Sequence, residues 1–358
     1  MLLYVVRRIL LMVPTLVGVL LINFVIIQAA PGGPVDQAIA RLQGTGLDAG
    51  VGLLGGGVAD ATLEMELTAT GGIDPALIEE LERQFGFDKP AHVRFGIMLR
   101  DYLRFDLGQS FYQDVPVIDL VLDRLPVSMS LGLWTLLIVY SVSIPLGIRK
   151  ATADGSPFDI WTSVVILVGY AIPAFILAVL LIVLFARGGM IEYFPLRGLV
   201  SDDFADLGTW AQVKDYFWHL VLPITALVAG SFATLTMLTK NSFLDEINKQ
   251  YVLTAKAKGL RPRRVLYGHV FRNAMLIIIA GFPRALVGAL FTGVLLAEII
   301  FSLDGLGLLG FEAIVTRDYP IIFGTLYIST LLALVLQLLT DVTYTLTDPR
   351  IDFERRDV

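Results

Sequence analysis

Six stretches of the chain are long and apolar enough to cross a lipid bilayer as helices. A spanning helix needs about 20 mostly apolar residues, because each residue rises about 1.5 Å through a hydrocarbon core about 30 Å thick. The predicted spans are residues 9–29, 128–148, 159–185, 217–239, 274–300 and 321–346. The pattern therefore predicts an all-α integral membrane protein with about six transmembrane helices.

The first span follows Arg7 and Arg8, as the apolar region of a secretory signal peptide would. Its apolar run from Ile9 to Ile27 is longer than the usual signal-peptide core of about 7–15 residues. We expect an uncleaved N-terminal anchor over residues 1–30, with a cleaved signal peptide as the alternative.

Residues 31–127 are too long for a simple connection between two spans. The glycine-rich part, 44–57, predicts irregular structure. Asp74 and Pro75 are typical of a helix start, and apolar residues recur at helical spacing beyond them. We therefore expect a small insertion on the outer side, helical over 74–105, followed by a core of five spans over 128–346 and a tail over 347–358.

The polar connection 241–272 predicts a short amphipathic helix, a turn and a second helix. Phe243, Ile247, Tyr251 and Thr254/Ala255 fall on one helical face. Gly259 stands where a helix commonly ends, and Pro262 stands where the next one begins. Such an apolar face can lie on the bilayer or fit a groove in another protein, and periodicity does not separate the two.

The composition agrees with a membrane protein, because 56% of the residues are hydrophobic and only 17% are charged. Soluble domains are about a quarter charged. Basic residues gather in alternate connections, as the positive-inside rule requires of cytoplasmic segments. They are Arg7 and Arg8, Arg149 and Lys150, the 241–272 loop with Lys249, Lys256, Lys258, Arg261, Arg263, Arg264 and Arg272, and the tail with Arg350, Arg355 and Arg356. The other connections are acidic, so we expect both termini in the cytoplasm.

Few ionisable groups lie inside the predicted spans, and this argues against an ion-coupled carrier. They are Arg284, Glu298 and Asp341. Interhelical or interfacial pairing is the favoured interpretation, and a place on a transport pathway is the alternative. Pro173 and Pro283 are candidates for bends that line such a pathway, with ordinary helix packing as the equal alternative.

Catalytic motifs are missing from the sequence. It has no cysteine, no phosphate-binding G-x-x-x-x-G-K-[ST] loop and no nucleophile elbow, and its three histidines are too scattered to suggest a metal site. We expect a subunit that is not an enzyme and carries no cofactor of its own. If ATP drives this protein, another chain must bind the nucleotide and its magnesium.

Two segments of the 241–272 loop, Tyr251 to Gly259 and His269 to Ala274, resemble the coupling loop of ABC importer permeases, in particular the dipeptide/oligopeptide branch. Other segments resemble the same branch, closest to its Yej-type permeases, in the same order along the chain. They are 30–39, 105–110, 143–150, 194–200, 238–245, 301–310, 317–320 and 348–351.

The resemblance implies the type I ABC importer permease fold and an ATP-driven importer of peptides or peptide-like compounds such as microcin C. It implies a second homologous permease, an ABC ATPase carrying ATP and magnesium, a periplasmic peptide-binding protein and a place in the bacterial inner membrane. By the same resemblance the residues that couple to the ATPase are Tyr251, Thr254, Ala255, Gly259, His269, Arg272 and Asn273. The competing hypotheses are a secondary carrier acting alone, which would take up substrate down an ion gradient, and a membrane sensor, which would transport nothing.

Overall fold

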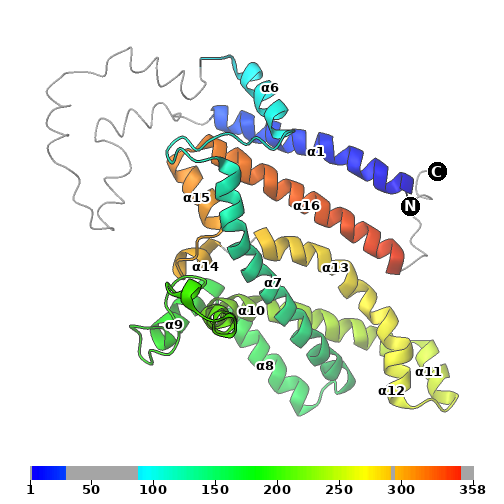
Figure 1. Ribbon diagram of the computed structural model, residues 1–358. Helices are drawn as coiled ribbons and strands as arrows, with labels where there is room; N and C mark the ends of the chain where they lie inside the picture. The colour runs from blue at the N-terminus through cyan, green and yellow to red at the C-terminus, as the bar shows by residue number, and fades with distance from the viewer. Residues whose placement is uncertain (1, 30–87, 292–294, 348–358) are drawn as a thin grey trace. The chain divides into compact units, whose positions relative to one another are not determined.

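The computed structural model describes residues 2–29, 88–291 and 295–347 (Figure 1). The helices in these ranges are α1 (Leu2–Ala29), α6 (Ala91–Tyr102), α7 (Val117–Thr152), α8 (Pro157–Ala171), α9 (Ala174–Phe185), η1 (Phe204–Asp206), α10 (Thr209–Ile247), α11 (Gln250–Ala257), α12 (Pro262–Val265), η2 (Leu266–Val270), α13 (Phe271–Phe291), α14 (Leu295–Ile300), α15 (Leu306–Thr316) and α16 (Tyr319–Thr347). Five helices are long and apolar enough to cross a membrane, or six if α8 and α9 form one span. The predicted all-α membrane fold is confirmed.

The third predicted span, 159–185, is not one continuous helix. It consists of α8 and α9, which meet at an angle of 93°. The break falls at Ile172, whose backbone is extended (φ −87°, ψ 118°), just before Pro173. A proline disfavours helical backbone at the residue before it, so the bend has a local cause. The predicted bend at Pro173 is therefore present, although the sequence did not indicate its size.

Other helix bounds also differ from the prediction. α7 begins at Val117 and α10 runs from Thr209 to Ile247, so both extend well beyond their apolar centres. α15 was not predicted, because its 11 residues include two glycines and are too short for a span. Within the predicted helical region 74–105, the second part contains α6, while residues 74–87 and the glycine-rich 44–57 segment lie outside the described residues.

The chain forms two compact units, and α1, α7, α15 and α16 each contribute to both. Unit 2 contains residues 6–123 and 309–331. The ring of Phe24 on α1 lies 5.3 Å from that of Phe95 on α6 and 6.0 Å from that of Phe323 on α16. The Asp318 carboxylate accepts hydrogen bonds from the Ser110 hydroxyl (2.5 Å) and the Phe111 amide (3.1 Å). Two of the resembling segments, 105–110 and 317–320, therefore meet in this unit.

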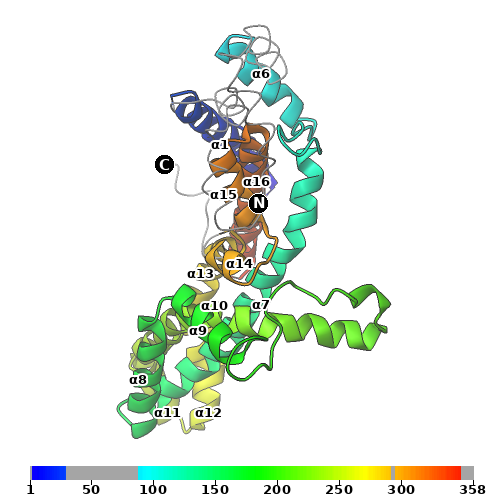
Figure 2. The ribbon, with the colours of Figure 1, turned by 90° about the vertical axis from the view of Figure 1, so that its left-hand side faces the viewer.

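Unit 1 contains residues 1–5, 124–308 and 332–358, and α10 is its central helix. It packs against α8, α9 and α13, and Figure 2 shows α8 and α9 beside it. One buried cluster includes Leu131, Leu220 and Phe301. A second, built on Phe243 and Ile148, lies beneath the 241–272 loop.

The contact between α7 and α10 is close because of one glycine. A Cβ atom at Gly147 would lie 2.6 Å from Thr239 Cβ and 2.8 Å from the Thr236 carbonyl oxygen. Such distances are not compatible with a side chain, so glycine is required where these two backbones meet. This contact holds α7 against the part of α10 that leads into the 241–272 loop.

Candidate functional site

The 241–272 loop is a folded structure between α10 and α13. The predicted amphipathic helix is broken, because α10 ends at Ile247 and α11 begins at Gln250. The Asn248 side chain donates a hydrogen bond back to the Leu244 carbonyl (3.0 Å), and Lys249 takes extended backbone (φ −76°, ψ 153°). The result is a helical corner where the sequence predicted one helix.

The predicted stop and restart of the loop are both present. Gly259 has a φ of +80°, a conformation that favours glycine over other residues. The Leu260 amide donates to the Ala255 carbonyl (3.3 Å), which is the capping bond expected around a glycine at this position. Pro262 is the first residue of α12, and the π-helical turn η2 then leads into α13.

The inner face of the loop is part of the core. Val252, Val265 and Val270 are buried together with Phe243. Ala255 is only 8% exposed, whereas its neighbour Thr254 is exposed. Of the two residues that shared the predicted face, alanine therefore faces the interior and threonine faces outward.

A carboxylate that the sequence analysis missed holds the corner together. Glu246, on the last turn of α10, contacts the Lys249 ammonium, accepts a hydrogen bond from the Tyr251 hydroxyl (2.7 Å) and is hydrogen-bonded to the Asn273 side chain. The pKa of the Tyr251 phenol is raised, chiefly by burial and secondly by its hydrogen bond to Glu246. The phenol therefore keeps its proton and remains a hydrogen-bond donor. Two predicted site residues, Tyr251 and Asn273, thus share one partner and fix α11 against α13.

The outer face of the loop leaves apolar side chains uncovered. Leu253 is 56% exposed and Tyr267 is 54% exposed. The loop also exposes basic residues, three of which border a shallow hollow together with Tyr267. The basic residues are Lys256, Lys258, Arg261, Arg263, Arg264 and Arg272. The predicted site residues Thr254, Gly259, His269 and Asn273 are also exposed, so this face combines apolar contact area with positive charge.

A buried ion cluster lies just before the loop, at the ends of α7, α8 and α10. The Lys150 ammonium is fully buried and donates to the Asp159 carbonyl, Thr162 and Ser163 at 2.7–2.8 Å. Its nitrogen also lies 2.9 Å from Asp159 Oδ1. The carboxylate therefore balances the charge of the ammonium group, while the three neutral oxygens accept its hydrogen bonds. Lys240 reaches the other oxygen of Asp159 at 2.7 Å and Asp154 at 2.8 Å.

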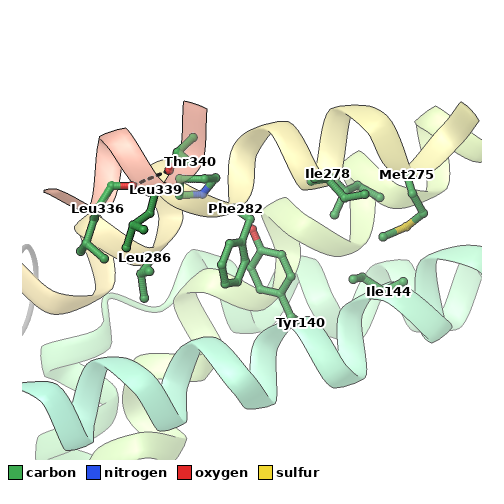
Figure 3. A pocket seen from close by; sticks show the side chains of 11 residues that line it. Tyr140, Ile144, Met275, Ile278, Phe282, Leu286, Leu336, Leu339 and Thr340 are labelled. Atoms are coloured by element: carbon green, nitrogen blue, oxygen red, sulfur yellow. Dashed lines mark hydrogen bonds between the residues drawn. The ribbon is translucent and has the colours of Figure 1, made fainter. Parts of the chain in front are cut away.

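Unit 1 also contains two cavities between its helices. The larger, about 570 Å³, is formed chiefly by α7, α10 and α13. The smaller, about 300 Å³, is lined by apolar side chains of α7, α13 and α16 (Figure 3). The rings of Tyr140 and Phe282 lie next to each other in it (Figure 3), in an edge-to-face arrangement with centroids 5.2 Å apart. Pro283 is buried in its wall, and Ala174, next to Pro173, lines the larger cavity.

Glu298 lines neither cavity and is enclosed completely. Its carboxylate accepts hydrogen bonds from the Ser128 hydroxyl (2.8 Å) and the Leu308 amide (2.7 Å). The Leu306 amide in turn donates to Ser128 Oγ at 2.8 Å. A Cβ at Gly305 would lie 2.0 Å from the carboxylate, so the glycine-rich 301–310 segment folds around it. This arrangement is the interhelical pairing that the sequence analysis favoured.

Comparison with known proteins is consistent across the whole chain. "Peptidoglycan transport system permease protein YejB" of Agrobacterium fabrum (strain C58) is 58% identical, covering 99% of each chain. "Inner membrane ABC transporter permease protein YejB" of Escherichia coli O157:H7 is 55% identical, also covering 99% of each. "Oligopeptide transport system permease protein AppB" of Bacillus subtilis (strain 168) is 31% identical, covering 98% of this chain and 99% of that one. A chain of the MetNI methionine ABC transporter aligns with 64% of this chain, at 14% identity and a TM-score of 0.48.

Residues 143–353 match a protein family, and the matched range contains the bent α8–α9 pair, the central helix α10 and the 241–272 loop. The relatives that match along the whole length carry permease names. The protein therefore belongs to the family of inner membrane components of binding-protein-dependent transport systems.

Proposed function

We propose that this chain is the transmembrane permease subunit of an ATP-driven importer for peptides. It forms one half of the pathway, and a second, homologous permease forms the other. A periplasmic binding protein delivers the substrate, and a separate ABC ATPase binds ATP and magnesium. The chain itself performs no chemistry; its work is a change of conformation, and it lies in the bacterial inner membrane with both termini in the cytoplasm.

The observation that carries the proposal is the uncovered face of the 241–272 loop in a chain of this family. Its inner face is packed, and its corner is fixed by Glu246, so the outer face is held as a rigid surface. The exposed Leu253 and Tyr267 give that surface apolar area for a protein partner, and the basic residues around them favour a partner with acidic groups. We assign this surface to the ATPase.

The substrate follows from the relatives. One relative is named for oligopeptides and another for peptidoglycan, whose fragments carry short peptides. A peptide is the part that both kinds of compound share. Competition between a labelled tripeptide and a peptidoglycan-derived fragment, measured with the reconstituted importer, decides which is preferred.

The docking assignment is tested by Leu253→Asp, which places a charge on the uncovered apolar surface. The side chain is 56% exposed, so the chain is expected to fold and insert normally. We expect the ATPase to be lost on co-purification and peptide uptake to fall at unchanged abundance. Leu103→Asp is the control, because Leu103 is 67% exposed but lies just after α6, far along the chain from the loop. Uptake and co-purification like those of the wild type in Leu253→Asp would contradict the assignment.

A further inference from the structure

The larger cavity of unit 1 has a wall of aliphatic, small and hydroxyl-bearing residues. Its volume of about 570 Å³ lies within the range of about 300–1,000 Å³ that is usual for pockets that bind small ligands. No residue of this wall has a charged side chain. The wall includes Thr135 of α7, Gly230 and Ser231 of α10 and Gly281 of α13.

These two glycines of the wall are not needed for helix packing. A Cβ atom at Gly230 or at Gly281 would meet nothing within 4 Å. Gly147 is the contrasting case, since its missing side chain lets α7 and α10 touch. At Gly230 and Gly281 the missing side chain instead leaves space in the cavity.

One buried hydroxyl in this wall is unsatisfied. Thr135 is only 7% exposed, and its Oγ1 has no hydrogen-bond partner among the residues that the structure describes. Thr239 and Thr340, two other buried threonines of unit 1, each donate to a carbonyl one turn back, Thr239 to Leu235 (2.8 Å) and Thr340 to Leu336 (2.7 Å). Thr236, which is buried outside the cavity wall, also has a hydroxyl without a partner among the described residues, so Thr135 is distinguished by its place in the wall. The Thr340 bond, drawn in Figure 3, satisfies the threonine hydroxyl of the smaller cavity. A polar group that is buried without a partner is costly, so Thr135 is poised for a partner from outside the chain.

Ser231, on α10, adds a second hydroxyl to the same wall. Its contact with the Leu227 carbonyl is long, at 3.4 Å, so this hydroxyl is weakly held. The cavity therefore offers Thr135 and Ser231 from different helices, together with the hydroxyl-bearing Tyr140 and Thr234, in a wall that is otherwise apolar and uncharged. This chemistry suits an uncharged chain of amide groups, which donates and accepts hydrogen bonds at regular intervals, rather than an ion.

We propose that this cavity is the part of the transport pathway that contacts the substrate, and that Thr135, assisted by Ser231, hydrogen-bonds the main chain of the transported peptide. The inference rests on the transport function proposed above. By this proposal, the subunit recognises the peptide main chain, which all peptides share. The wall has no charged group that could pair with a charged side chain of the substrate.

The test uses the complete importer, with its partner subunits, in proteoliposomes and with labelled tri-alanine as the probe. Thr135→Val keeps the shape of the side chain and removes the hydroxyl. Loss of one hydrogen bond is expected to lower uptake at limiting peptide by about three- to tenfold. Thr239→Val is the matched control, because Thr239 is fully buried on α10 and already bonded within its own helix. Its uptake is expected to equal that of the wild type.

A second variant fills the space. Gly230→Leu is expected to abolish tri-alanine uptake while the second permease and the ATPase still co-purify, since the new side chain enters open space. Gly169→Leu on α8, where a Cβ also meets nothing within 4 Å and which lies outside the cavity wall, is its control.

The outcomes are distinct. If the wild-type importer takes up no peptide, the proposed function fails. If it transports tri-alanine and both Thr135→Val and Gly230→Leu behave like their controls, the cavity assignment is wrong. If Gly230→Leu instead expels the second permease while Thr135→Val is neutral, the cavity is a subunit contact, and the assignment is again overturned.

Discussion

Glu298 illustrates how a single residue organises its surroundings in unit 1. Its carboxylate is fully enclosed and is held by neutral donors, the Ser128 hydroxyl and the Leu308 amide. An acidic side chain is rarely buried without such partners, because removal from water is costly. Gly305 leaves room for the carboxylate, and any larger residue at position 305 would collide with it.

Replacement of Glu298 should therefore weaken the fold rather than change a transport rate alone. Glu298→Ala leaves buried donors without acceptors, at a cost of about 1–3 kcal/mol for each such group. Glu298→Gln keeps one acceptor oxygen and should lose less. The midpoint temperature of thermal unfolding in detergent is expected to fall slightly for Glu298→Gln and further for Glu298→Ala. The control is Glu312→Ala, which removes an exposed carboxylate on α15, and an equal midpoint for Glu298→Ala and Glu312→Ala would refute the role.

At the scale of elements, one buried carboxylate joins three helices. Asp159 on α8 faces Lys150 of α7 and Lys240 of α10, and the Gly155 amide also donates to it (3.2 Å). Because Lys240 precedes the 241–272 loop directly, this cluster sets the position from which the loop leaves the helices. The loop's uncovered face then depends on an arrangement outside the loop itself.

Two substitutions separate the buried half of this cluster from its exposed half. Asp159→Asn leaves the buried Lys150 without its counter-charge, and breaking a buried pair costs about 3–5 kcal/mol. Asp154→Asn removes the other partner of Lys240, but Asp154 is 53% exposed, and such pairs contribute about 0–1 kcal/mol. The amount of folded protein in the membrane and its unfolding midpoint should fall sharply only for Asp159→Asn. If the two variants lost similar amounts of folded protein and stability, the buried Asp159 would not be what holds the three helices together.

Local rules explain which elements could be predicted from the sequence. Gly259 and Pro262 mark a helix end and a helix start by their own backbone preferences, and both are where the sequence placed them. The bend at Pro173 was indicated, but its angle depends on what α9 packs against. The bonds of Glu246 to Asn273 and of Ser128 to Glu298 join residues far apart in the chain. Hydrophobic periodicity carries no information on such pairs, and the unsatisfied Thr135 is likewise invisible without the cavity around it.

At the scale of the whole molecule, the distribution of charge predicts how the chain crosses the membrane. The 241–272 loop is strongly basic, while the connection between α9 and α10 carries Asp202, Asp203 and Asp206. The positive-inside rule then assigns the first to the cytoplasm and the second to the outer side. The proposed docking of an ATPase depends on this orientation, because ATP is available on the cytoplasmic side.

The absence of cysteine from the sequence makes the orientation directly measurable, because a single introduced thiol labels without background. Lys258 and Asp203 are both exposed, so Lys258→Cys and Asp203→Cys should each react fully with a maleimide in detergent. In intact spheroplasts, a membrane-impermeant maleimide should label Asp203→Cys and leave Lys258→Cys unlabelled until the membrane is opened. The detergent reaction controls for accessibility, and the wild-type chain controls for background. Labelling of Lys258→Cys in intact spheroplasts would place the loop outside. The basic face around Leu253 and Tyr267 could not then meet a cytoplasmic ATPase, so this outcome would overturn the docking assignment together with the orientation.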